Sequence, residues 1–369
     1  MEFYFGWSKK SFNMALKKLK IRDKVVEHCI IQGGMGVGVS LHPLAKAVAQ
    51  NGGIGVISSV ALDRLLSKRN NKKYSIYEAC EEEVALAKDG SNCIGINIMV
   101  AVQKDYEASV KGAITGGVDI IISGAGLPTE LPKVATSKDV ALVPIVSSLR
   151  AFDIICKRWE RFGRRPDAVV VEGPLAGGHL GFRFADLDKE ENKLENILPP
   201  IKEKAIKCGD IPVIVAGGIY THDDIKKFLD MGADGVQMGT RFLATFESSA
   251  SPEYKQAVIR ANKDDIVVAY RPGSPSGLPF RVIKSSPMYQ DALLAKRHPN
   301  CDKGYLLNKD GYCPAMVDNI NYFCICNGLL SSAGYNSDKE KPIYTVGANA
   351  YRVDGLLSVE ELMKELVYG

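Results

Sequence analysis

Eight short runs rich in valine and isoleucine recur along the 369-residue chain, and amphipathic stretches separate them. The runs are Val25–Ile31, Gly55–Ser58, Ile94–Val100, Ile120–Ser123, Leu142–Val146, Ala168–Val171, Val213–Ala216 and Gly235–Met238. Continuous apolar runs of this length are typical of strands buried on both faces, as in a parallel sheet. Eight of them alternating with helical segments predict an α/β protein with a (β/α)8 TIM-barrel fold. A doubly wound sheet is the alternative, but it needs no eighth strand.

Small and polar residues follow nearly every one of these runs at its C-terminal end. They include Gln32-Gly33-Gly34-Met35, Asn97, Ser123-Gly124, Ser147-Ser148, Glu172-Gly173, Ala216-Gly217-Gly218 and Gln237-Met238-Gly239-Thr240. Active sites of α/β barrels lie at this end of the strands. Glycine also lets the backbone approach a ligand closely, because it has no Cβ. The pattern therefore predicts a ligand site at the carboxyl ends of the strands.

A glycine-rich loop behind the sixth run carries the main candidate for a catalytic residue. In the string Val171 to Gly181 (VEGPLAGGHLG), His179 follows Gly177 and Gly178. Imidazole titrates near neutral pH, so a histidine beside a ligand loop is suited to acid–base chemistry. His28, His42, His222 and His298 have no such setting, and we interpret them as structural.

The last two runs carry the signature of a phosphate site. Glycine-rich loops after strands seven and eight of a barrel direct backbone N–H groups at an anion. Gly217-Gly218 and Gly239-Thr240 match this pattern. The Rossmann fingerprint G-x-G-x-x-G with a downstream acidic residue is missing from the sequence. One phosphate and a planar ring across the strand ends indicate flavin mononucleotide (FMN), whereas a sugar phosphate satisfies the phosphate half only.

Composition and charge exclude several classes of function. The chain is 46% hydrophobic and 24% charged, with a formal net charge of +4, which is ordinary for a soluble globular protein. The basic run at 64–73 is short and is interpreted as a solvated segment, so no nucleic-acid partner is expected. The sequence shows no secretory signal and no apolar run of membrane-spanning length, so we expect a cytoplasmic protein without a membrane partner.

Four of the nine cysteines lie in the C-terminal part, at Cys301, Cys313, Cys324 and Cys326. Thiolates at such density can bind zinc or an iron–sulfur cluster. However, the C-x-C spacing lacks the C-x2-C geometry of ordinary zinc knuckles. We therefore expect no metal, with a cluster or zinc at these four residues as the minor alternative.

Six strings in order resemble the nitronate monooxygenase (2-nitropropane dioxygenase) family, which includes the enoyl-acyl-carrier-protein reductase II flavoproteins. They are IIQGGM, GINIMV, IISGAGLP, VEGPLAGGHLG, IPVIVAGGI and GADGVQMGTRF. Together they span roughly residues 25–285. The resemblance implies an FMN-binding TIM barrel at 25–286 with an insertion at 182–196. It is preceded by an N-terminal segment at 1–24 and followed by a cysteine-containing C-terminal extension at 287–369 that packs on the barrel.

The resemblance also assigns roles to individual residues. His179 falls on the catalytic histidine of the family. The cofactor-binding residues would be Gln32, Gly33, Gly34, Met35, Asn97, Ser123, Gly124, Glu172, Gly173, Gly177, Gly178, Ala216, Gly217, Gly218, Gln237, Met238, Gly239 and Thr240. Glu172 stands where the family often has glutamine, which leaves its protonation state open. Arg281 and Lys284 are either surface charges or contacts for an acidic group of the substrate.

The activity implied is that of an FMN-dependent oxidoreductase. The leading hypothesis is oxidation of an alkyl nitronate with dioxygen through a flavin semiquinone, with His179 as base or orienting residue. The alternative is an enoyl-thioester reductase that takes hydride from NAD(P)H as co-substrate. Less expected is a non-catalytic flavin redox sensor, or a phosphosugar isomerase on the same barrel. A homodimer is possible on the resemblance alone.

Overall fold

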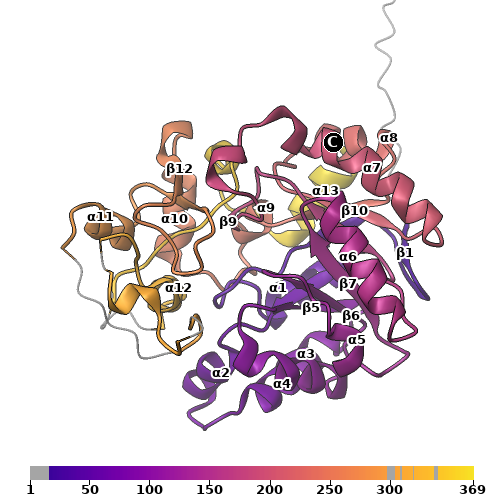
Figure 1. Ribbon diagram of the computed structural model, residues 1–369, viewed down its shortest axis with the longest axis horizontal. Helices are drawn as coiled ribbons and strands as arrows, with labels where there is room; N and C mark the ends of the chain where they lie inside the picture. Colours follow the sequence, from indigo (N-terminus) through magenta and orange to yellow (C-terminus); the bar gives the residue numbers. More distant parts are fainter. Residues whose placement is uncertain (1–15, 297–303, 308–309, 319, 336–339) are drawn as a thin grey trace, which may run out of the picture.

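Eight parallel strands form the centre of the protein (Figure 1). The computed structural model describes residues 16–296, 304–307, 310–318, 320–335 and 340–369. The eight strands are β3 (Ile30–Gln32), β4 (Gly55–Ser58), β5 (Ile94–Met99), β6 (Ile120–Gly124), β7 (Ala141–Val146), β8 (Val169–Glu172), β10 (Val213–Ala216) and β11 (Gly235–Met238). Their order is β3-β11-β10-β8-β7-β6-β5-β4, and a parallel bridge between Ile31 and Ile54 joins the two end strands. The predicted TIM barrel is confirmed, and the doubly wound alternative is wrong.

Helices surround the barrel, and the last helix of the chain completes the ring. The helices are α1 (His42–Gln50), α2 (Leu62–Asn70), α3 (Ile76–Lys88), α4 (Gln103–Thr115), α5 (Leu131–Val134), α6 (Leu149–Glu160), α7 (Leu194–Lys207), α8 (His222–Asp230), α9 (Thr240–Leu243), α10 (Pro252–Arg260), α11 (Pro287–Leu293), α12 (Ile325–Ser332) and α13 (Val359–Tyr368). α13 packs against both α1 and α8. It is held there by a bidentate ion pair between Arg241 and Glu365, with N–O distances of 3.0 and 2.8 Å.

The first predicted strand, 25–31, is wrong as one continuous element. Its first part belongs to β2 (Lys24–Val26), which pairs antiparallel with β1 (Leu19–Ile21). The barrel strand β3 begins only at Ile30. The exposed Val25 and the buried Val26 alternate as in a strand with one solvated face, whereas all three residues of β3 are buried. The change from alternation to continuous burial therefore marks the boundary between the hairpin and the barrel.

A small antiparallel sheet lies above the carboxyl ends of the barrel strands. Its order is β12 (Ile266–Ala269), β13 (Phe280–Ile283) and β9 (Gly178–His179). The expected insertion at 182–196 contains two short 3-10 helices, Phe184–Asp186 and Glu190–Asn192, and leads into α7. In Figure 1, α11, α12 and β12 gather on one side of the barrel, away from α6 and α7.

Both α8 and α13 begin with a capping box. Thr221 caps α8 and forms a capping box with Asp224. Ser358 caps α13 in the same way, with Glu361. Within the described residues, no helix combines the length and apolar character needed to cross a membrane.

Packing of α1 on β4 requires glycine at position 55. A Cβ there would lie 1.8 Å from the carbonyl oxygen of Ala45 in α1, so helix and strand would have to separate. We predict that Gly55→Ala lowers the free energy of unfolding by about 3 kcal/mol. Urea denaturation followed by circular dichroism measures it. The control is Gly355→Ala, where a Cβ meets nothing within 4 Å and the expected change is below about 0.5 kcal/mol. Equal stability of the two variants would contradict the packing argument.

Candidate active site

A cavity of about 970 Å³ lies at the carboxyl ends of the barrel strands. Sites for drug-sized ligands span about 300–1,000 Å³, so this one is at the upper end of the range. Most of the site residues expected from the sequence line it, namely Gly33, Gly34, Met35, Asn97, Gly124, Glu172, Gly177, Gly178, His179, Ala216, Gly217, Gly218, Gln237, Met238, Gly239 and Thr240. The fold therefore brings residues from most of the strand ends to one site.

Three of the expected cofactor-binding residues do not line this cavity. Gln32 turns its side chain into the barrel wall, where Nε2 donates to Ser40 Oγ at 2.8 Å. Ser123 is fully buried and donates to the carbonyl oxygen of Ile98 at 2.8 Å. Gly173 is buried and its N–H donates to a backbone carbonyl of β10. Their polar groups hold neighbouring strands together and so shape the site from behind.

Glycines without side chains line the cavity at the ends of β3, β10 and β11. Gly217 and Gly218 have φ values of +95° and +86°, a conformation that other residues rarely adopt. At Gly34, a Cβ would lie 2.4 Å from the Cβ of Asn97. Glycine at these positions thus allows the strand-end loops to pack closely together, and all three glycines also line the cavity.

A segment of the C-terminal extension, residues 345–349, covers the loops of β10 and β11. The N–H of Gly347 donates to Thr240 Oγ1 at 2.9 Å. The side chain of Asn349 donates to the carbonyl oxygen of Gly218 at 2.5 Å. Thr345, Val346, Gly347 and Asn349 all line the cavity. The resemblance implied that the extension packs on the barrel, but not that it forms part of the cavity wall.

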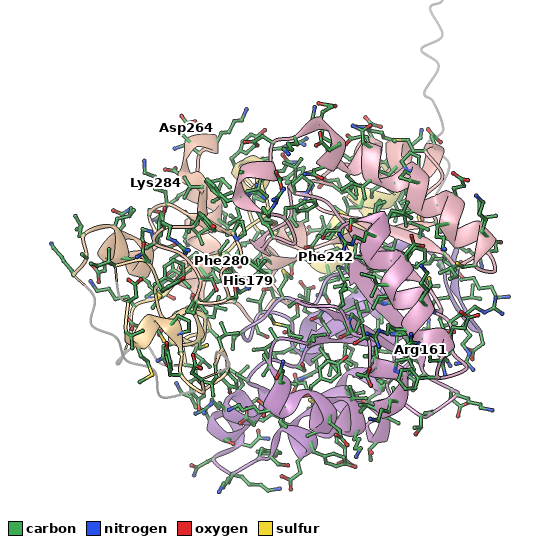
Figure 2. All side chains as sticks on the ribbon, viewed as in Figure 1. Arg161, His179, Phe242, Asp264, Phe280 and Lys284 are labelled. Carbon is green, nitrogen blue, oxygen red and sulfur yellow. The ribbon has the colours of Figure 1, made fainter. Side chains whose placement is uncertain are left out.

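His179 is held at the cavity wall by the small antiparallel sheet. It pairs with Phe280 in β13, and the two rings lie 4.7 Å apart, side by side in Figure 2. Its Nε2 lies 2.7 Å from Ser274 Oγ. Burial lowers the pKa of His179 to about 4, because the charged form loses solvation. The imidazole is therefore neutral at physiological pH.

Glu172 ends β8 and faces the same cavity. Burial raises the pKa of Glu172 to about 7, again because the charged form is desolvated. Within the described part of the chain, the carboxyl group makes neither a hydrogen bond nor an ion pair that would stabilise its charge. The site thus carries a carboxyl group that is about half protonated near pH 7 and largely protonated below about pH 6.

Arg281 is buried and binds the backbone of the loop before His179, a role that the sequence did not predict. It is 8% exposed, and its Nη1 donates to the carbonyl oxygens of Pro174, at 2.8 Å, and of Ala176. It therefore fixes the loop that leads to His179. Lys284, in contrast, is exposed and lies at the outer side of the small sheet, away from His179 (Figure 2). Neither side chain lines the cavity.

The side chains present fit a flavin. The amide oxygen Oε1 of Gln237 is buried in the cavity wall and lacks a hydrogen-bond partner within the described residues. Such atoms are rare in folded proteins, so a donor from a ligand is expected there. The ring of a flavin carries an N–H donor, and the glycine loops suit its phosphate. Gln237, the glycine loops and the partly protonated Glu172 therefore form a set of polar groups compatible with FMN.

The C-terminal cysteines divide between described and undescribed parts of the chain. Cys301 lies outside the described residues, as does His298. Cys313 and Cys324 are buried, and Cys326 lines the cavity. Among the described residues, no three histidine, cysteine or acidic side chains are arranged to hold a metal ion.

We predict opposite effects of Glu172 and His179 on the pH dependence of stability. Folding raises the pKa of Glu172 from 4.5 to about 7, so its contribution to the free energy of unfolding falls as pH rises through that window. Folding lowers the pKa of His179 from 6.5 to about 4, so its contribution to the free energy of unfolding falls as pH falls through that window. Glu172→Gln should therefore stabilise the protein relative to wild type above about pH 7, and His179→Asn below about pH 5. Urea unfolding across this range tests both, and parallel pH profiles for wild type and variants would contradict the assignment.

Gln237 provides a test of the flavin site itself. Gln237→Met removes the unpaired amide while keeping a side chain of similar length. We expect the affinity for FMN to fall about tenfold or more, since one buried hydrogen bond is lost. The melting temperature of the flavin-free protein should stay the same or rise, because an unsatisfied polar atom is removed. Titration of flavin-free protein with FMN measures the affinity. An unchanged affinity would show that Gln237 does not contact the ligand.

Comparison with known proteins identifies the family. A curated relative from Staphylococcus aureus, "Probable nitronate monooxygenase", is 25% identical over 307 residues, covering 72% of this chain and 79% of the relative. A carboxyl-CoA dehydrogenase from Mycobacterium tuberculosis is 30% identical over 262 residues, covering 70% of this chain and 64% of that protein. The solved structure of FabK from Thermotoga maritima is 26% identical, covers 92% of both chains and has a TM-score of 0.67. The nitronate monooxygenase family model matches residues 17–369, and the chain belongs to this family of flavin-dependent oxidoreductases.

Proposed function

We propose that the protein is an FMN-dependent oxidoreductase of the nitronate monooxygenase type, which oxidises alkyl nitronates with dioxygen. The observation that carries the proposal is the placement of His179 in one cavity with the glycine loops of β10 and β11. The first provides a basic or orienting group, and the second provides an anion site. FMN would lie with its phosphate at Gly217, Gly218, Gly239 and Thr240, and with its ring along Gly33, Gly34, Met35 and Asn97.

When bound, the flavin supplies the redox chemistry, while the protein supplies position and exclusion of water. His179 binds the substrate through Nδ1, which has no partner in the described structure, while Nε2 is engaged with Ser274. The hydroxyl of Ser274 can accept from Nε2–H or donate to Nε2, so this contact allows either tautomer. With the proton on Nδ1, the imidazole donates to an oxygen of the nitronate and orients it. With the proton on Nε2, Nδ1 is an acceptor.

Glu172 sets the charge of the site. A nitronate is an anion, and an ionised carboxylate beside it would repel it. Because the pKa of Glu172 is about 7, its carboxyl group is protonated at lower pH and can donate a hydrogen bond to the substrate or the flavin. The site is then free of negative protein charge where the anion binds.

Reduction of an enoyl thioester by NAD(P)H is the second candidate, and two observations favour it. The relative from Mycobacterium tuberculosis is named for activity on a CoA thioester. In addition, reduction of an alkene requires a proton at the carbon that does not receive hydride, and the protonated Glu172 or a water held by His179 could provide it.

Rapid mixing without oxygen separates the two candidates. Bleaching of the flavin by a nitronate, followed by oxygen uptake after aeration, supports the nitronate reaction. Bleaching by NADH or NADPH, with reoxidation by an enoyl thioester, supports the reductase. Stable oxidised flavin with all of these substrates would contradict both.

His179→Ala tests the proposed role of the imidazole. We expect kcat/KM to fall about a hundredfold or more, since the group that positions the substrate is lost. The flavin content should remain at the wild-type level, because His179 is not part of the phosphate site. The matched control is His28→Ala, which replaces a half-buried histidine outside the cavity and should leave kcat/KM unchanged. Full activity of His179→Ala would end this assignment.

A further inference from the structure

The cavity continues beyond the loops assigned to the flavin, into an apolar arm between the barrel and the C-terminal extension. The arm is lined by Val60, Met99, Val102, Tyr305, Leu329 and Leu330. The first three follow or end β4 and β5, and the last two belong to α12. In the order of the barrel, β5 is the strand opposite β10, whose loop forms the expected phosphate site. The arm therefore lies across the barrel from the phosphate site.

These side chains pack as one hydrophobic cluster, yet part of their surface faces the cavity. Val102, Tyr305 and Leu330 are buried members of the cluster, and half-buried side chains pack against them. Val60, Met99 and Leu329 are half-buried and border the cavity directly. None of the six side chains is charged. The arm thus offers an apolar wall from two sides, and its surface becomes fully dehydrated only when an apolar ligand fills it.

The polar groups at this end of the cavity are already engaged with one another. The Nε of Arg64 donates to the hydroxyl of Tyr305 at 2.9 Å. The ammonium group of Lys104 lies 4.3 Å from the centre of the Tyr305 ring. The acidic Asp63 and Asp105 lie within electrostatic range of Arg64. Tyr305 therefore lines the arm with its hydroxyl bonded to Arg64.

We propose that this arm binds the hydrocarbon tail of the substrate, so that the enzyme acts on substrates with an aliphatic chain of several carbons. The inference rests on the proposed function for the reacting head group, which lies beside His179 and the flavin. It makes the C-terminal extension a determinant of specificity, because α12 and Tyr305 form one wall of the arm. A nitronate of two or three carbons would leave the arm unfilled.

The first experiment measures chain-length preference in the flavin-loaded enzyme. The kcat/KM for the nitronates of 1-nitropropane, 1-nitrohexane and 1-nitrooctane should rise by about fourfold per methylene until the arm is full. Val60→Phe fills the arm, so it should remove this rise and bring the ratio of kcat/KM for the octyl and propyl compounds to about one. Val25→Phe makes the same exchange at an exposed position and should keep the full rise.

Leu329→Ala tests the arm independently, in case Val60→Phe does not fold. It enlarges the arm and should shift the preferred chain to greater length. Flavin content is measured for every variant and should be unchanged. Loss of FMN in Val60→Phe would show that the arm holds the flavin ring, which would overturn the proposal.

Binding of 1-propanol and 1-octanol to the flavin-loaded enzyme, measured by calorimetry, separates failure of this proposal from failure of the proposed function. Tighter binding of 1-octanol that is lost in Val60→Phe supports the arm even if no nitronate is oxidised. Equal affinities for the two alcohols, or turnover that does not depend on chain length, would overturn the proposal while leaving the nitronate activity intact.

Discussion

The structure depends on closure of a parallel sheet. In a closed parallel barrel, all strands end at the same face, so eight loops that are far apart in sequence must converge there. Here the closure is made by β3 and β4, through the Ile31–Ile54 bridge and the hydrogen bond from Gln32 N to Ile54 O at 2.9 Å. The site depends on this arrangement, because the loops of β3, β5, β8, β10 and β11 line one cavity although they are separated in the chain.

The second determinant is desolvation. The cavity wall removes water from both titratable groups, and this raises the pKa of Glu172 and lowers that of His179. His179 is therefore neutral near pH 7, and Glu172, which would be ionised if free in water, is only about half ionised there. A neutral site lined by glycine backbone suits a flavin, whose ring is itself uncharged when oxidised. The buried Arg281 contributes by holding the Pro174 and Ala176 carbonyls, which positions the loop that carries His179.

Seven of the eight barrel strands follow from hydrophobic runs, because strands buried on both faces leave a continuous apolar signal. The first strand was misread, since the apolar Val25 and Val26 belong to a hairpin and only the following polar pair Glu27-His28 marks the break. Most cavity-lining residues could be predicted because glycines and polar residues stand directly after strands. Gln32 and Ser123 also stand at strand ends, but their side chains point into the barrel wall. The residue types around a strand end do not show whether a given side chain faces the cavity or the wall.

Long-range contributions to the site were beyond sequence reasoning. The pairing of His179 with Phe280 joins a two-residue strand to a segment about a hundred residues away. Neither segment has a sequence pattern that predicts this pairing. The same holds for residues 345–349 over the β10 and β11 loops, and for α12 in the cavity wall. The C-terminal extension therefore forms part of the cavity wall, and this is visible only in three dimensions.

The central claim is that the carboxyl ends of these strands hold one flavin. The visible absorption spectrum of the purified protein, followed by mass analysis of the ligand released on denaturation, tests it most directly. The account predicts the two absorption bands of an oxidised flavin and release of FMN in a one-to-one ratio with the chain. A colourless protein that takes up no FMN on titration would contradict it.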